Sequence, residues 1–145
     1  DLLNIAERVY PVGRLDKDTT GLLILTNDGR IHHQLSHPSF DHEKEYEVKV
    51  ARPIPQGALL KMAKGLPLMD TKTRPATIQR ISATRFRIVL KEGKNRQIRR
   101  MVRKVGNQVV ELKRIRIADI KLGKLPLGGW RYLTAREKDL LLKML

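Results

Sequence analysis

The chain has 145 residues, and its 41% share of hydrophobic residues suits one folded domain with a core and excludes a disordered tail. Thirty Lys and Arg against fifteen Asp and Glu give a formal net charge of +15, which favours a polyanionic partner, most commonly nucleic acid. There is no cysteine, so disulfides and thiolate metal sites are excluded, and no apolar stretch reaches the roughly 20 residues that span a bilayer.

Hydrophobic periodicity and turn residues predict the elements of the chain. In order, these are a buried strand at 22–26, a short helix at 31–35, a half-buried strand at 43–50, a helix from 56 that ends at Gly65, strands at 75–81 and 85–93, a helix at 95–105, a strand at 108–117 and a final helix from 134. Thr134 followed by Glu137 has the pattern of a capping box. Strands with scattered helices and no regular βαβ alternation indicate an α+β domain.

Two acids precede the first apolar strand in GRLDKDTTGLLILTNDG, residues 13–29. A carboxylate beside a core strand is costly to desolvate, so it is usually paired, bound to a metal or used in chemistry. A calcium loop from Asp16 would need a bidentate Glu at its twelfth position, where Asn27 stands, and we reject it. The segment also fits a phosphotransferase Asp-x-Asp-x-Thr motif, but that motif should follow an apolar strand, whereas this one precedes it, so the fit is weak. The spacing alone leaves a salt-bridged structural Asp, which it favours, or a metal-free catalytic carboxylate.

The segment EGKNRQIRRMVRKVG, residues 92–106, predicts an amphipathic helix. At 3.6 residues per turn one stripe of it carries Arg96, Arg99, Arg100 and Arg103. No acid lies on this helix, and like charges at this spacing repel, so an anionic partner such as phosphate is expected. One of these arginines could instead pair with a buried carboxylate such as Asp16.

The aromatic residues and histidines are few. Most of the six aromatic residues are expected in the core. The six are Tyr10, Phe40, Tyr46, Phe86, Trp130 and Tyr132. Alternation in EKEYEVKV places Tyr46 on the face of two valines, so its ring should be buried on at least one side. The histidines are irregularly spaced and have no Cys partner, so contacts with phosphate or solvent are favoured over a metal site. These histidines are His32, His33, His37 and His42.

Three segments in this order resemble the pseudouridine synthases that modify ribosomal RNA: GRLDKDTTGLLILTNDG, EKEYEVKV and EGKNRQIRRM. The likeness covers nearly the whole chain and is greatest to the group typified by the small-subunit enzyme and its large-subunit relatives. It implies an α+β fold with a mainly antiparallel sheet, flanking helices and a central RNA-binding cleft. The implied reaction isomerises a specific uridine of ribosomal RNA, with large-subunit RNA slightly favoured. No cofactor is required, because nothing is oxidised and no group is transferred in.

The resemblance also implies roles for individual residues. Asp16 takes the place of the family's catalytic Asp, Tyr46 lies against the target uracil, and Arg99 pairs with the catalytic carboxylate and keeps it ionised. Ile98 lines the pocket, and Arg14 lies near a phosphate or in the gap left by the flipped base. The expected contacts to the RNA backbone are Lys94, Arg96, Arg100 and Arg103.

Family members normally have an upstream Asn-Lys-Pro-like segment, and many carry a small RNA-binding domain before it. Neither occurs here, so we expect residues 1–145 to be one catalytic domain that is truncated at its N-terminus. A non-catalytic RNA-binding or ribosome-assembly module would explain the charge equally well, but gives no reason for the carboxylate. A metal-dependent phosphotransferase is a further alternative. We expect a cytoplasmic monomer that binds ribosomal RNA and no membrane.

Overall fold

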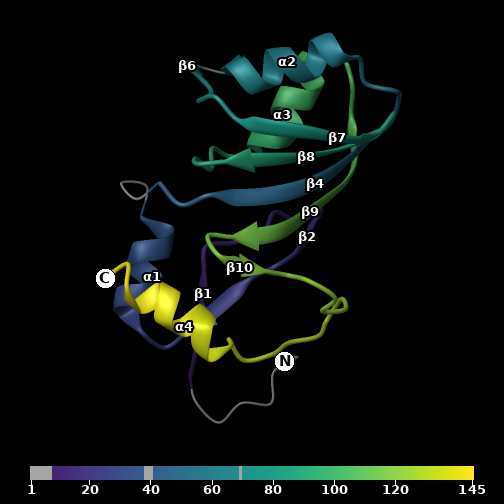
Figure 1. The fold of residues 1–145 in the computed structure, drawn as a ribbon. Helices are drawn as coiled ribbons and strands as arrows, with labels where there is room; N and C mark the ends of the chain where they lie inside the picture. Colours follow the sequence, from purple (N-terminus) through teal and green to yellow (C-terminus); the bar gives the residue numbers. More distant parts are fainter. Residues whose placement is uncertain (1–7, 38–40, 69) are drawn as a thin grey trace.

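The computed structural model describes residues 8–37, 41–68 and 70–145, and its centre is a six-stranded sheet (Figure 1). Five strands follow the order β10 (Ile120–Lys121), β9 (Val109–Ile117), β4 (Lys44–Val50), β8 (Arg85–Leu90) and β7 (Thr77–Ser82). These neighbours are antiparallel, whereas the sixth strand, β2 (Thr19–Gly21), runs parallel to β9. The domain is therefore of the α+β class, with the mainly antiparallel sheet that the sequence predicts.

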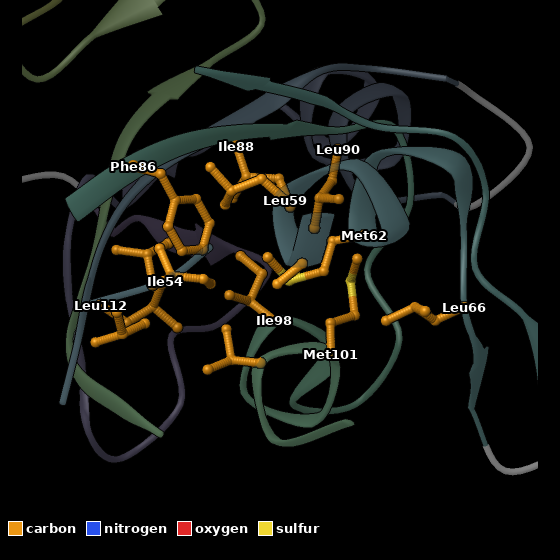
Figure 2. Packing of buried hydrophobic residues seen from close by; sticks show 14 of the residues in the cluster. Ile54, Leu59, Met62, Leu66, Phe86, Ile88, Leu90, Ile98, Met101 and Leu112 are labelled. Atoms are coloured by element: carbon orange, nitrogen blue, oxygen red, sulfur yellow. The ribbon is translucent and has the colours of Figure 1, made fainter. Parts of the chain in front are cut away.

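Helices α2 (Gln56–Lys64) and α3 (Gln97–Lys104) cover one face of this sheet and enclose the larger hydrophobic core. Figure 2 shows side chains of β8 and of both helices meeting in one cluster. Phe86, Met62 and Met101 are fully buried in it. Burial of a side chain of this size contributes about 1.5–3 kcal/mol, so the core holds β4, β8 and α3 firmly together.

A second, smaller core lies at the other end of the molecule (Figure 1). It involves α1 (Gly29–Ser36), α4 (Ala135–Leu142) and the antiparallel pair of β1 (Tyr10–Val12) with β3 (Ile24–Thr26). Its buried residues are Val12, Leu22, Ile24, Ile31, Leu35, Ile117, Ile120, Leu122 and Leu141. Strand β9 contributes to both cores, because its other end places a leucine in the larger one.

The predicted helices and longer strands are confirmed, with small shifts at their ends. Thr134 and Glu137 form the predicted capping box at the start of α4, and Gly65 ends α2. Periodicity does not predict the short pair of β5 (Pro67–Leu68) and β6 (Thr71–Lys72), nor β1, β2 and β10. None of the helices in the described ranges is long and apolar enough to cross a bilayer.

The expected strand at 22–26 is wrong in its first half. Gly21 has a φ of +113°, and a Cβ at this position would lie 2.2 Å from the carbonyl oxygen of Arg114. The chain turns here, and the Leu22 amide donates a hydrogen bond of 2.8 Å to that same carbonyl. Only the residues from Ile24 onward form β3. Leu22 and Leu23 therefore lie between β2 and β3, which pair with different strands.

The prediction that most aromatic residues lie in the core is wrong for those in the described part of the chain. Phe86 is fully buried and Tyr46 is half-buried, but Tyr10, Trp130 and Tyr132 are exposed. Aliphatic side chains and methionines fill nearly all of both cores instead. Phe40 lies outside the described residues.

Candidate active site

A cavity of about 520 Å³ brings together segments that lie far apart in the sequence. Its walls come from the loop between β1 and β2, the start of β4, the segment before α3 and the middle of β9. Six of the residues proposed from the sequence line it, and they are Arg14, Asp16, Tyr46, Lys94, Arg96 and Ile98. The remaining three, Arg99, Arg100 and Arg103, do not.

Asp16 lies on the exposed loop between β1 and β2. Its carbonyl oxygen accepts a hydrogen bond of 3.0 Å from the Thr19 amide, which closes a turn around it. Gly13, three residues earlier, has a φ of +69°, a backbone conformation that residues other than glycine rarely adopt. In the part of the chain that the structure describes, the Asp16 carboxylate forms no hydrogen bond or ion pair. This acid is therefore not a salt-bridged structural residue and is free to meet a ligand.

Arg99 holds the Asp16 loop through its backbone. Its Nη2 donates hydrogen bonds to the carbonyl oxygen of Asp18 at 2.6 Å and to Oγ1 of Thr19 at 3.4 Å. No ion pair joins Arg99 to Asp16, although both belong to the described residues. The resemblance implies a direct pairing of Arg99 with the Asp16 carboxylate, whereas here Arg99 contacts the backbone of Asp18, two residues further along. The contact fixes the loop that carries the carboxylate.

Tyr46 and Ile98 form an apolar wall of the cavity. Tyr46 is half-buried on β4 and packs against the larger core, while Ile98 is buried in the first turn of α3. The register places Tyr46 between Ile88 of β8 and Arg114 of β9. One side of the ring therefore rests on the core, as the strand pattern predicts, and the residue also faces the cavity.

Cationic side chains surround the mouth of the cavity. Arg14 and Arg96 are exposed, and Arg96 has the left-handed backbone angles φ 49° and ψ 38° just before α3 begins. Nζ of Lys94 forms an ion pair of 2.6 Å with Glu92. Burial would raise the pKa of Glu92, but hydrogen bonds from Lys94, the Arg74 amide and Gln97 hold that pKa below its ordinary value. Glu92 is thus an ionised anchor for the segment before α3.

Helix α3 has the two faces that its sequence predicts. Ile98, Met101 and Val102 are buried, whereas Arg103 is exposed. Arg100 donates from Nε to the Asn95 carbonyl at 3.0 Å and from Nη2 to the side-chain oxygen of the same residue at 3.3 Å. Arg100 and Arg103 are therefore surface cations of α3 outside the cavity itself.

Metal ligation has no support in the arrangement of side chains. Across residues 8–37, 41–68 and 70–145, no group of three or more His, Cys, Asp or Glu side chains could hold a metal ion. His33 and His37 lie with their ring centroids 4.8 Å apart on α1 and its C-cap. The cavity itself offers a carboxylate, a phenol and several cations.

The defining sequence pattern of the RNA pseudouridylate synthases matches residues 2–104. The chain belongs to this family. It is 42% identical over 145 residues to the dual-specificity RNA pseudouridine synthase RluF of Escherichia coli (strain K12), covering 100% of this chain and 50% of that protein. It is 41% identical over 140 residues to the ribosomal large subunit pseudouridine synthase B of Bacillus subtilis (strain 168), covering 92% of this chain and 57% of that protein. The chain thus spans little more than half the length of these relatives.

Solved structures show the same relationship. The crystal structure of a pseudouridylate synthase matches with a TM-score of 0.87 and 34% identity, over 94% of this chain and 60% of that one. The archaeal box H/ACA sRNP Nop10-Cbf5 complex matches with a TM-score of 0.56 and 21% identity, over 83% of this chain and 41% of that one, and supports the fold alone. The α+β pseudouridine synthase fold expected from the sequence is therefore confirmed.

The sequence analysis missed several residues of the cavity, two of them cations. Arg114 and Lys44 line the cavity, and Arg114 is only 4% exposed. Burial first, and the charge of Arg114 second, lower the pKa of Lys44. A signal was present, because Lys44 has the same strand parity as Tyr46 and Arg114 the same parity as the buried Leu112. Both are charges at inward positions of otherwise regular strands.

Proposed function

We propose that this chain carries the catalytic site of an enzyme that isomerises a uridine of ribosomal RNA to pseudouridine, with Asp16 as the catalytic carboxylate. The observation that carries the proposal is the cavity itself. It combines Asp16, a carboxylate that pairs with no described residue, with an aromatic ring, Tyr46, and exposed cations, Arg14 and Arg96, from three separate segments. Family membership says which reaction such a combination serves.

The reaction rearranges one nucleotide without a second reactant. The bond between N1 of uracil and C1′ of ribose breaks, the base turns over, and C5 bonds to C1′. The proton on C5 is lost and N1 takes one up, so atoms and electrons balance without a cofactor. Asp16 either attacks the ribose or abstracts a proton from it, and both routes need an ionised carboxylate beside the sugar. No described residue donates a hydrogen bond to the Asp16 carboxylate, so its lone pairs are available for this step.

The nucleotide must leave its stack before it can react. Flipping costs a few kcal/mol, which contacts of phosphates with Arg14, Arg96, Arg100 and Arg103 would offset. A cavity of about 520 Å³ is within the range of roughly 300–1,000 Å³ that small-ligand pockets occupy, so one nucleoside can enter. Tyr46 then holds the extruded base by stacking, and Ile98 closes the apolar side.

Ribosomal RNA is proposed as the substrate because two relatives of about 40% identity are named for a ribosomal subunit, one for the large and one for the small. A third relative is named as a dual-specificity RNA enzyme. We favour large-subunit RNA, as the sequence likeness does. Mapping pseudouridines in both ribosomal RNAs, from cells with and without the gene, identifies the subunit: an unchanged large-subunit map contradicts that preference.

The test is Asp16→Asn in the complete natural protein. The amide keeps the size of the side chain but removes its charge, so pseudouridine formation in ribosomal RNA transcripts should fall below detection while RNA affinity changes little. Asp139→Asn, an exposed position on α4, is the matched control for loss of one negative charge. Isomerisation by Asp16→Asn at the wild-type rate would refute the assignment. An inactive wild type that still binds RNA would favour a non-catalytic RNA-binding module.

A further inference from the structure

Two cations, the buried Arg114 and the half-buried Lys44, line the cavity. Nε of Arg114 donates a hydrogen bond of 2.9 Å to the Leu22 carbonyl, and its Nη2 is buried without any hydrogen-bond partner. Neither cation forms an ion pair with any residue that the structure describes. A buried guanidinium with an unsatisfied N–H and a neighbouring ammonium are unfavourable unless something negative compensates them.

The backbone holds both cations on one side of the sheet. Arg114 of β9 is the register partner of Tyr46 on β4, and Lys44 lies two residues before Tyr46, on the same face. A Cβ built on Gly93 would lie 3.5 Å from Nζ of Lys44, which places the ammonium at the wall formed by the segment before α3. Both cations are therefore close to the ring that would stack on the base.

Burial separates Arg114 from the arginines at the mouth of the cavity. Arg14 and Arg96 are exposed, at the side of the cavity where the phosphate backbone of a bound RNA would stay. Arg114 is only 4% exposed, and we call the part of the cavity formed by Arg114 and Lys44 its floor. The part of a flipped nucleotide that reaches the floor is the base and not the phosphate. Uracil has no charge at first, but it leaves ribose with the electron pair of the N1–C1′ bond. That negative charge spreads onto the carbonyl oxygens O2 and O4.

We propose that Lys44 and Arg114 bind the carbonyl oxygens of the flipped uracil and stabilise the negative charge that the ring acquires when its bond to ribose breaks. The inference rests on the proposed function and adds two residues that contact the base. The cations are fixed before the substrate arrives, so they need no reorganisation during the reaction. They also hold the detached ring as an anion until C5 bonds to C1′ and the C5 proton leaves.

The first experiment measures single-turnover rate and RNA affinity for Lys44→Met and Arg114→Lys in the complete natural protein. Each should lower the rate roughly 100-fold, as loss of one donor to a developing oxyanion does, with RNA affinity unchanged within about threefold. Lys49→Met on the opposite face of β4 and Arg87→Lys, exposed on β8, are the matched controls and should retain the wild-type rate. Unchanged rates in both cavity variants would overturn the inference.

Equal losses of rate and RNA affinity would also overturn it, because they would mean that the floor binds phosphate. If Arg114→Lys fails to fold, the result for Lys44→Met decides alone.

The second experiment compares free uracil with barbiturate, a planar pyrimidine ring that is anionic at neutral pH. Barbiturate should bind about tenfold more tightly than uracil to the wild type, and Lys44→Met should abolish that preference. Equal binding, or no binding of either, contradicts an anion-stabilising floor even if the enzyme proves inactive.

Discussion

Arg99 is predicted to act as a positioning residue, and Arg99→Met tests this. Its Nη2 donates to the carbonyl of Asp18 at 2.6 Å, so it fixes the loop two residues from the carboxylate of Asp16. A hydrogen bond from a charged donor contributes about 1.5–3 kcal/mol, and the half-exposed position of Arg99 favours the lower value. Because about 1.4 kcal/mol corresponds to a tenfold change in rate, we expect kcat to fall about tenfold.

The assay is steady-state isomerisation of a ribosomal RNA transcript, combined with amide hydrogen exchange. KM should stay nearly constant, since Arg99 does not line the cavity. Exchange at the Thr19 amide, which donates to the Asp16 carbonyl, should accelerate as the loop loosens. Lys104→Met, exposed at the end of the same helix, should change neither quantity. A wild-type kcat in Arg99→Met, or a lower kcat with unchanged exchange at Thr19, would refute the positioning role.

Two further predictions concern backbone strain and pH. Arg96 has a left-handed φ of 49°, so Arg96→Gly should raise the free energy of unfolding by about 1 kcal/mol in urea. The same variant should bind RNA more weakly and with a smaller salt dependence, because about one phosphate contact is lost. A loss of stability would show that the side chain, not the backbone, dominates there. Arg131 holds the pKa of Glu137 down to about 2, below its ordinary 4.5, so the ionised acid stabilises the fold above pH 4.5 and this contribution disappears as pH falls towards 2. Glu137→Gln should therefore lower Tm at pH 7 but not at pH 2, and an equal difference at both would contradict the assignment.

The sequence predicts those parts of the fold that depend on local periodicity. The alternation around Val48 and Val50 identifies β4, and the apolar stripe of α3 identifies its buried face. Gly21 illustrates the limit of this reasoning. The turn there is imposed by the backbone of Arg114, which lies 93 positions away along the chain, and no local pattern contains that contact.

The candidate site was predictable where motifs carry the chemistry. Asp16 and Tyr46 come from the family resemblance, and the structure brings both to one cavity. Arg99 was expected at the carboxylate, but which acceptor a long side chain reaches depends on the loop conformation rather than on spacing. Lys44 was overlooked because a lysine at the start of a strand is usually solvated, although its parity with Tyr46 places it on the side of the strand that lines the cavity.

The cavity lies where the two hydrophobic cores meet, and this bears on how the proposed reaction is controlled. Val12 and Leu22, which flank the Asp16 loop, belong to the smaller core, whereas Tyr46 packs against the larger one. Close-packed cores resist deformation, so core packing holds both the ribose side and the base side of the cavity in place. The base must turn over while the ribose stays beside the carboxylate. Packing of Tyr46 against the larger core fixes the wall beside the ring, while Val12 and Leu22 in the smaller core fix the two ends of the loop that carries the carboxylate.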